Sequence, residues 1–298
     1  MVYYVFRFRR STDVIIDEVH WYPFFSILYA PKKTVLLVCE VANRLLFRLL
    51  PYPAALLARL IEKLYFLLYH NASVLAISDS TRDALLAEGF GSGQITVIPM
   101  GLSLPKRIKR YPKSSQLTII IIGRLHAFKG TADAIDAFAA IHARVPGAIL
   151  WVVGGDSEGY QSDLERRVGE LGVSGNVTFF GRVSEEKKFE LLARSHILLM
   201  PSVHEGWGLV VAEAASQETP AVGYRTAGVQ DVIVDGKTGI LVPACNPKPL
   251  AAQTVKLWED KRLYKKFQEA GKKRAAAMSW DDTARAALTA IKKVNEKA

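Results

Sequence analysis

Short apolar runs alternate along the chain with longer segments in which apolar residues recur at helical spacing. This alternation predicts strands joined by helical crossovers, which form parallel sheets covered by helices on both faces. We therefore expect an α/β protein. The predicted strands are 13–17, 34–38, 73–77, 95–98, 117–122, 148–153, 176–180, 197–200, 221–224 and 239–242. The predicted helices are 82–88, 131–144, 158–171, 184–194, 209–217, 229–234, 248–259, 261–276 and 280–294.

Length and composition allow one large domain or two ordinary ones. The chain has 298 residues, and 50% of them are hydrophobic, which is ample for two ordinary domains with separate cores. A basic, proline-flanked stretch at 105–116 separates the apolar runs into two groups and is predicted to be the linker. We assign 1–104 to an N-terminal domain. The segment 117–278 has enough alternating strands and helices for a complete Rossmann-like domain.

A loop spaced by glycines follows the eighth predicted strand and carries the first candidate chemistry. Gly206 and Gly208 allow backbone to approach a ligand closely. The helix that starts at about Leu209 directs its free N–H groups toward this loop, which suits a phosphate. Glu205 in the loop and Glu213 in the helix can accept hydrogen bonds from paired sugar hydroxyls. From these residues alone, a tight loop before a helix with solvated glutamates remains the alternative.

A second loop follows the predicted strand 117–122 and reads Gly-Arg-Leu-His-Ala-Phe-Lys-Gly at 123–130. Two cations near the start of a helix, between flexible glycines, suit a diphosphate. Arg124 can bind oxygens in fork geometry, and Lys129 adds a point charge. Surface cations in such a loop are also common in proteins that bind no phosphate, so this pattern alone leaves both interpretations open.

Taken together, the two loops resemble those of the group 1 glycosyltransferases, which are retaining enzymes also called glycosyltransferase family 4. Glu205 and Glu213 match the Glu-x7-Glu signature of that family, and 123–130 resembles its Gly-Arg-x4-Lys-Gly segment. The resemblance is close from 117 to about 285 and looser over 13–104. It implies the GT-B fold, in which two Rossmann-like domains with parallel sheets face each other across a cleft.

The resemblance also implies an activity: transfer of a sugar from a nucleoside-diphosphate sugar to an acceptor hydroxyl. Retention of the anomeric configuration is expected, with no bound metal and no other cofactor. The residues expected to bind the donor are Gly123, Arg124, Lys129, Val183, Glu205, Gly206, Trp207, Gly208, Leu209 and Glu213. Of these, Val183 would contact the nucleobase through its backbone. The residues expected to be catalytic are Glu205, Arg124, Lys129 and His20.

Each of these roles follows the family pattern. Arg124 and Lys129 would stabilise the departing diphosphate. Glu205 would hold the donor sugar, and Glu213 would bind the ribose hydroxyls. His20 follows a predicted strand and would orient or deprotonate the acceptor, although an exposed loop histidine without a role is the alternative.

Compared with this family, the first portion of the chain is expected to be an incomplete domain, beginning on the order of 100 residues late for a domain of typical size. Cys39 or Glu40 stands where the family usually has a histidine. A partner chain that supplies the missing segment is therefore a further expectation. The alternative to an active enzyme is a non-catalytic nucleotide-binding or scaffold subunit. The segment 279–298 resembles the family's last helix, which crosses back to the first domain.

Residues 41–70 are rich in leucine and are interrupted by Arg44, Arg48, Arg59 and Lys63. Two prolines predict that the segment forms two helices. Its longest uncharged run is too short to span a bilayer. An apolar face with cationic edges is typical of a helix lying in a membrane interface. A helix packed on the sheet, with its arginines extended outward, is the alternative. The expected acceptor is a glycan or a lipid-linked saccharide, and a lipid-linked acceptor would favour the membrane interpretation.

The net charge of +10 is concentrated in the first portion of the chain. Residues 1–116 carry 15 Lys+Arg and 8 Asp+Glu, a balance of +7, and the remainder carries 24 and 21, a balance of +3. A basic first portion suits an anionic membrane surface or an anionic acceptor. We do not expect a nucleic-acid partner, because the sequence has no helix-turn-helix, zinc or RNP-type pattern.

Two cysteines far apart in the sequence, and no evident signal peptide, favour a cytoplasmic protein, with peripheral contact to the cytoplasmic face of the membrane as a further expectation. A nicotinamide-dependent dehydrogenase would share the sheet architecture. It is disfavoured because Gly154, Gly155 and Gly159 do not have the spacing of a dinucleotide fingerprint.

Overall fold

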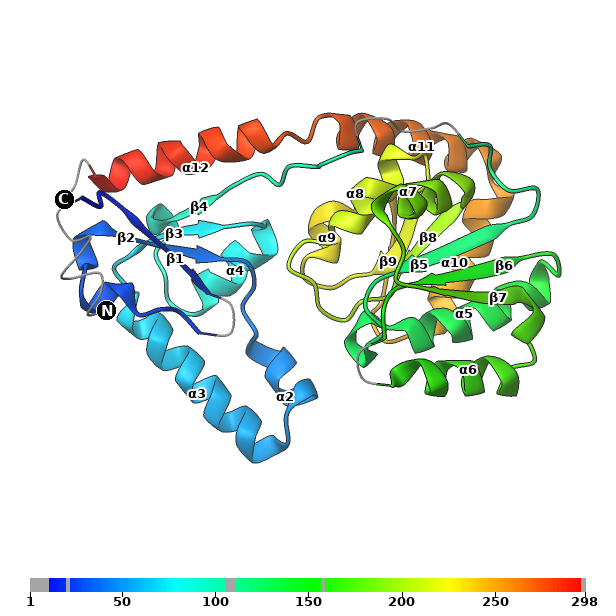
Figure 1. Ribbon diagram of the computed structural model, residues 1–298, viewed down its shortest axis with the longest axis horizontal. Coiled ribbons are helices and arrows are strands. Elements are labelled where there is room, and N and C mark those ends of the chain that lie inside the picture. The colour runs from blue at the N-terminus through cyan, green and yellow to red at the C-terminus, as the bar shows by residue number, and fades with distance from the viewer. Residues whose placement is uncertain (1–10, 20–21, 106–110, 157–158, 296–298) are drawn as a thin grey trace. The chain divides into compact units, whose positions relative to one another are not determined.

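A computed structural model describes residues 11–19, 22–105, 111–156 and 159–295 of the protein (Figure 1). The chain divides into two compact units. The first comprises Met1–Gly101 and Ser279–Ala298, and the second comprises Leu102–Met278. Each unit contains a parallel sheet, so the expected α/β class is confirmed. Within the predicted linker, 106–110 lies outside the described residues.

The first unit has four parallel strands in the order β1-β2-β3-β4. These strands are β1 Ile15–Val19, β2 Thr34–Val38, β3 Ser73–Ala76 and β4 Ile95–Val97. The α-helices of this unit are α2 Leu46–Leu49, α3 Tyr52–Leu68, α4 Asp79–Ala87 and α12 Trp280–Asn295. Pro51 precedes α3 and separates it from α2, as the prolines predicted. The last helix, α12, packs Ala286 and Ala290 against Val35 and Leu75 of the sheet.

The strand predicted at 13–17 is wrong in its bounds, because β1 begins and ends two positions later. Asp17 resembles a strand end in the sequence but is buried within β1. Its carboxylate accepts hydrogen bonds at 2.8 Å from the backbone N–H groups of Phe24 and Ser26, at 2.7 Å from the Ser26 hydroxyl, and from the Tyr69 hydroxyl. A buried carboxylate is tolerated where donors surround it, so this strand continues through a charged residue.

The second unit has six parallel strands in the order β10-β9-β8-β5-β6-β7. These strands are β5 Thr118–Ile122, β6 Ile149–Val153, β7 Val177–Gly181, β8 Ile197–Met200, β9 Ala221–Tyr224 and β10 Gly239–Val242. The helices are α5 Thr131–Arg144, α6 Tyr160–Glu170, α7 Glu185–Arg194, α8 Leu209–Ser216, α9 Val229–Val232, α10 Pro247–Glu259 and α11 Lys261–Ala276. Short 3-10 turns lie at Ser26–Leu28, Pro31–Lys33, Asn43–Leu45, Ser92–Gln94, Ala127–Lys129 and Ser174–Asn176.

Helices cover both faces of this second sheet, with α5, α6 and α10 on one face and α7, α8 and α11 on the other (Figure 1). All four residues of β8 are buried, and so are the first four of β5. A strand covered on both faces needs apolar side chains on both, which explains runs without alternation. The helix predicted at 229–234 is shorter than expected, because Ile233 leaves the helix in an extended conformation and is buried.

Lys113 attaches the start of the second unit to the ends of two of its helices. Its ammonium group donates to the carbonyl oxygens of Ser195 at 2.6 Å and Gln217 at 3.2 Å, and to the Thr219 hydroxyl at 2.7 Å. Ser195 and Gln217 directly follow α7 and α8, where helix carbonyls carry partial negative charge. Burial nevertheless lowers the pKa of Lys113 to about 7.

We predict a pH-dependent contribution of Lys113 to stability. Between a folded-state pKa of about 7 and an ordinary value of 10.5, the unfolded chain binds a proton that the folded chain has lost, so stability rises with pH in that window. The unfolding free energy of the wild type minus that of Lys113→Met should therefore become more positive as pH increases from about 7 to about 9.5. Urea titrations at several pH values measure this difference.

Lys265→Met is the matched control, because the Lys265 side chain is exposed on α11. Its difference from the wild type should not change over the same pH range. A constant difference for Lys113→Met as well would show that Lys113 keeps its proton in the folded state.

Candidate functional site

The carboxyl ends of β5 and β8 lie side by side because these strands are neighbours in the sheet. From β5 the chain proceeds through β6 and β7, and then returns to β8 on the other side of β5. The direction of strand succession therefore reverses between β5 and β8. In open parallel sheets, ligands bind outside the carboxyl ends of the strands at such a reversal. Both candidate loops, 123–130 and 201–208, begin at this point.

Lys129 and Glu205 contact each other across these two loops. Lys129 Nζ lies 2.6 Å from Glu205 Oε1, and the Ser202 hydroxyl donates to the same oxygen at 2.9 Å. The two charged side chains are only 20% and 14% exposed. The Val203 N–H also donates to the Phe128 carbonyl at 2.9 Å, which ties the loop backbones together. The cation predicted to bind diphosphate and the carboxylate predicted to hold sugar therefore lie at one place.

Two glycines let the loops come this close. Gly130 has a φ of +69°, and a Cβ there would lie 2.1 Å from the carbonyl oxygen of Pro201. Gly228, just before α9, has a φ of +77°, and a Cβ there would lie 2.2 Å from the carbonyl oxygen of Glu205. Side chains are disfavoured at such φ values and have no space here. The position of Glu205 therefore depends on glycine at 228.

The segment between Glu205 and α8 consists of Gly206, Trp207 and Gly208. Gly208 adopts a φ of +86° and precedes the first helical residue, Leu209, while Trp207 is buried. The N–H groups in the first turn of a helix have no acceptor inside the helix and give its start a positive character. No acidic residue lies in the first turn of α8. The start of this helix suits an anion.

Glu213 lies one turn inside α8 and pairs with Lys188 of α7. Lys188 Nζ donates to Glu213 Oε1 at 2.8 Å and lies 2.9 Å from Glu185 Oε2. Burial acts to lower the pKa of Lys188, but the hydrogen bonds with Glu185 and Glu213 outweigh it and raise the pKa above its ordinary value. Lys188 is thus charged and orients Glu213, whose carboxylate has further lone pairs for hydroxyl donors.

The remaining predicted residues lie on neighbouring elements or outside the described part. The Gly123 N–H donates to the Val153 carbonyl at 3.0 Å, which places the 123–130 loop beside the end of β6. Arg124 is exposed and forms no ion pair within the part of the chain that the structure describes. Val183 is half-buried between β7 and α7. His20 lies outside the described residues.

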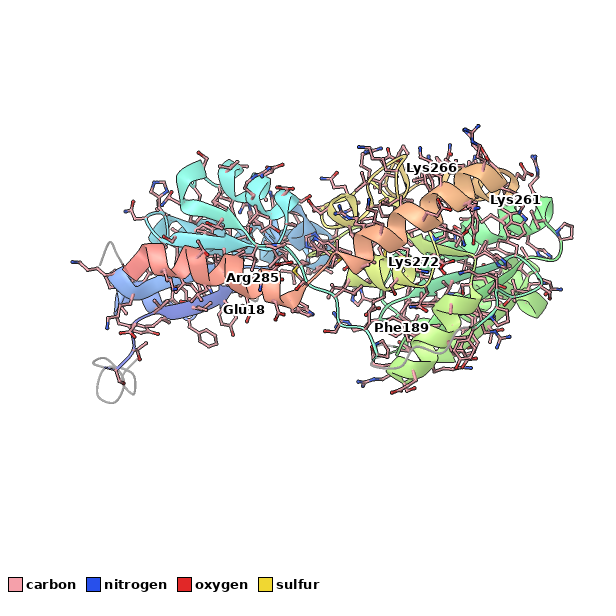
Figure 2. All side chains as sticks on the ribbon, turned by 90° about the horizontal axis from the view of Figure 1, so that it is seen from above. Glu18, Phe189, Lys261, Lys266, Lys272 and Arg285 are labelled. Carbon is pink, nitrogen blue, oxygen red and sulfur yellow. The ribbon has the colours of Figure 1, made fainter. Side chains whose placement is uncertain are left out.

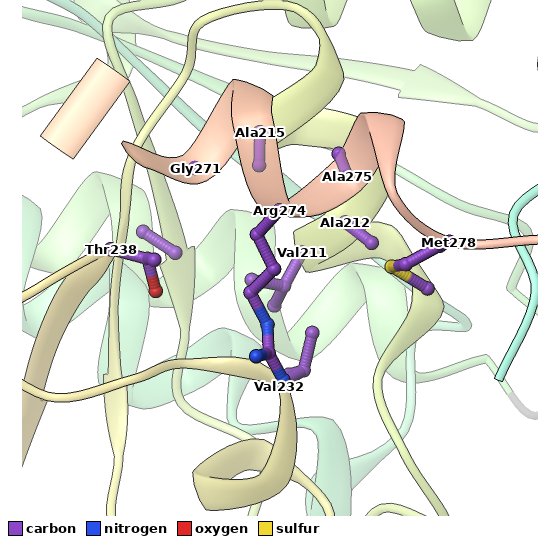
Figure 3. Close-up of a pocket in the computed structure, with 10 residues that line it drawn as sticks. Val211, Ala212, Ala215, Val232, Thr238, Gly271, Arg274, Ala275 and Met278 are labelled. Carbon is purple, nitrogen blue, oxygen red and sulfur yellow. The ribbon is translucent and has the colours of Figure 1, made fainter. Parts of the chain in front are cut away.

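Helix α9 supports the Glu205 loop from behind, and α11 holds α9 in place. The Gly228 N–H donates to the Asp231 carboxylate at 3.0 Å, and Arg274 donates to the Asp231 carbonyl at 3.0 Å. Figure 3 shows Arg274 reaching from α11 toward Val232, beside a small pocket also lined by Val211 of α8. The position of Glu205 is therefore linked to α11 through α9.

The sequence matches a known protein family. The model of the family described as glycosyl transferases group 1 matches residues 105–274, more than half of the chain. The chain belongs to the group 1 glycosyl transferases. It is 30% identical over 235 residues to the D-inositol 3-phosphate glycosyltransferase of Corynebacterium urealyticum, covering 72% of this chain and 55% of that protein. It is 31% identical over 191 residues to the glycogen synthase of Mycobacterium tuberculosis, covering 62% and 44%. The chain spans about half the length of these curated relatives.

Solved structures share the fold of this group 1 glycosyl transferase. The HepE protein of Anabaena, solved in complex with UDP and glucose, superposes with a TM-score of 0.70 at 20% identity, over 86% of this chain and 71% of that protein. The sucrose-phosphate synthase of Thermosynechococcus elongatus gives a TM-score of 0.71 at 21% identity, over 89% and 68%. The expected GT-B fold is thereby confirmed.

Three residues of the site were not predicted from the sequence. Lys188 lies in a Glu-Glu-Lys-Lys run that is typical of a solvated helix surface. The local sequence does not indicate the roles of Ser202 and Gly228. It shows only that Ser202 follows β8 and that Gly228 precedes α9. Their roles depend on partners distant in the sequence. Among the described residues, no group of three or more His, Cys, Asp and Glu side chains is arranged to hold a metal ion.

We predict that Gly228→Ala destabilises the protein more than a positive φ alone would. A positive φ costs a side chain about 1–3 kcal/mol, and the contact with the Glu205 carbonyl adds to that cost. Gly236→Ala is the matched control, because Gly236 has a φ of +70° and nothing within 4 Å of its Cβ position. Urea unfolding should show the larger loss for Gly228→Ala. Equal losses would mean that the Glu205 loop moves aside freely.

Proposed function

We propose that this group 1 glycosyl transferase moves a sugar from a nucleoside-diphosphate sugar to an acceptor hydroxyl, with retention of the anomeric configuration. The contact between Lys129 and Glu205 is the observation that carries the proposal. In such a donor, a single oxygen joins the sugar to the diphosphate. The cation proposed for the diphosphate and the carboxylate proposed for the sugar are likewise direct neighbours, 2.6 Å apart. One donor molecule would therefore engage both.

The chemistry would be mainly electrostatic. When the bond from the sugar to the diphosphate breaks, negative charge builds up on the departing oxygen. Lys129, Arg124 and the start of α8 would stabilise that charge, because preorganised donors act most strongly where charge develops. Shielding of the Lys129–Glu205 pair from water strengthens these interactions. Neither a bound metal nor another cofactor is part of the proposal.

The rest of the donor would extend along the same edge of the sheet. Glu213, oriented by Lys188, would accept hydrogen bonds from the ribose hydroxyls, and the backbone at Val183 would contact the base. His20 would orient or deprotonate the acceptor. The HepE structure, which contains UDP and glucose, makes a uridine nucleotide and a hexose reasonable first probes.

We further propose a role in glycan, polysaccharide or glycolipid synthesis. The acceptor would be a glycan or a lipid-linked saccharide, and the protein would work in the cytoplasm with contact to the membrane surface through residues 41–70. The basic balance of residues 1–116 supports an anionic surface or acceptor as a partner. A partner chain that completes the first domain remains part of this proposal.

We predict that the chain binds one of UDP, GDP and ADP, and that the Arg124→Ala, Lys129→Ala double variant binds it much more weakly. Each lost charge-assisted hydrogen bond to the diphosphate should weaken binding about 10- to 100-fold. Turnover should fall on the order of 10²–10³-fold. Isothermal titration calorimetry with the free nucleotides and then their sugar conjugates measures binding. Lys265→Ala, an exposed lysine on α11, is the matched control.

Glu213→Ala separates the parts of the site, because it should weaken nucleotide binding while leaving the Lys129–Glu205 contact in place. Normal binding by the double variant would refute the site assignment. Tight binding by the wild type with no transfer to any acceptor would instead support a nucleotide-binding subunit that needs a partner chain.

A further inference from the structure

The helix α3 has its apolar side outward. Leu57, Leu60, Leu64 and Leu67 are between 52% and 70% exposed. Surface helices of globular proteins normally direct such a stripe toward the core and their charged residues toward water. We define the α2–α3 apolar face by its exposed large apolar residues: Phe47, Leu50, Leu56, Leu57, Leu60, Ile61, Leu64, Leu67 and Leu68.

The inward side of α3 packs Tyr65 and Phe66 in the core and also carries two of the three charged residues of the helix, Arg59 and Glu62. Glu62 is buried, and its carboxylate accepts hydrogen bonds from the backbone N–H groups of Ala42 at 2.9 Å and Asn43 at 3.1 Å. Arg59 donates to Glu62 at 2.7 Å and also to Glu88 of the segment after α4. These contacts fix the orientation of α3, because turning the helix over would leave the N–H groups of Ala42 and Asn43 without their acceptor and would remove Tyr65 and Phe66 from the core. The apolar face is therefore held toward solvent.

The charge on the exposed side has one sign. Glu62 is the only acidic residue between 41 and 70, and it is turned inward. Arg48 and Lys63 are exposed beside the apolar face. An apolar helix face bordered by cations, with no exposed carboxylate, is complementary to a bilayer surface that contains anionic lipids. Two copies packed through this face would bring Arg48 and Lys63 of each copy close together, and like charges repel one another.

We infer that the α2–α3 apolar face is a docking surface for an anionic lipid bilayer, with α3 lying in the plane of the interface. Seventeen residues make α3 roughly 26 Å long, and among the described residues no helix is both long and apolar enough to cross a membrane. Leucine side chains would enter the acyl region while Arg48 and Lys63 contact lipid phosphates. The inference deepens the proposed membrane contact and is independent of the donor site.

Vesicle flotation tests this docking. The purified chain should float with vesicles of equal amounts of phosphatidylcholine and phosphatidylglycerol, float less with phosphatidylcholine alone, and lose binding as salt is raised. Leu64→Glu should reduce partition into the anionic vesicles roughly 10-fold or more. Its matched control is Leu288→Glu on α12, since Leu288 is 51% exposed and Leu64 is 52% exposed. The control should float like the wild type.

A charge pair gives a second, independent comparison. Arg48→Glu with Lys63→Glu should weaken partition roughly 10-fold or more. Lys265→Glu with Lys266→Glu on α11 should not, and Figure 2 shows Lys266 on that helix. Circular dichroism melting shows whether each variant is folded, and calorimetric nucleotide binding reports separately on the donor site. A lack of membrane binding would therefore not count against the donor site, and a lack of nucleotide binding would not count against membrane docking.

Three results would overturn the inference. The first is a folded, monodisperse wild type that stays at the bottom of the gradient with anionic vesicles. The second is Leu64→Glu floating as well as Leu288→Glu. The third is concentration-dependent self-association, without vesicle binding, that Leu64→Glu abolishes, because the face would then bind a second copy of the chain.

Discussion

The contact between Lys129 and Glu205 joins residues 76 positions apart, and it depends on the parallel pairing of β5 with β8. Parallel strands deliver their carboxyl ends to one edge, and the reversal of strand order at this pair removes any crossover that would cover the edge. The loops at this edge are thus free to approach one another. The hydrogen bond from Val203 to Phe128 holds the loops together, and the Ser202 hydroxyl donates to Glu205 within its own loop.

The two loops can approach each other because glycine stands at positions 130 and 228. At Gly130 and Gly228 the neighbouring backbone comes within reach of where a side chain would stand. At these two positions a carbonyl oxygen occupies the space that a side chain would need, and Arg274 of α11 donates to the Asp231 carbonyl of α9. The backbone packing at Gly130 and Gly228 and the hydrogen bond from Val203 to Phe128 hold the loop that carries Glu205. This rigidity suits electrostatic stabilisation, which requires donors already in place.

The sequence predicts the parts of the fold in which local pattern and tertiary environment agree. Strand β8 and helix α5 follow directly from an uninterrupted apolar run and a helical period, and the loop glycines mark the site. Prediction fails where a polar residue finds a distant partner. Asp17 looks like a strand end because its donors, Ser26 and Tyr69, lie on other elements. Lys188 looks solvated because Glu213 is not its neighbour in sequence. The outward face of α3 was ambiguous for the same reason.

Net charge alone does not favour the first unit at a membrane. Met1–Gly101 with Ser279–Ala298 carries 14 Lys+Arg and 11 Asp+Glu, a balance of +3, and Leu102–Met278 carries 25 and 18, a balance of +7. At physiological salt the Debye length is about 8 Å, so cations attract a bilayer only when they are almost in contact with it. Electrostatics can therefore orient the first unit at an anionic surface but cannot hold it there for long. Retention would require apolar side chains that enter the lipid. Because Glu62 and Arg59 hold the inward side of α3 in place, the leucine side chains on its outer side are exposed. In this way a buried ion pair in the first unit would influence how long the protein stays at a membrane.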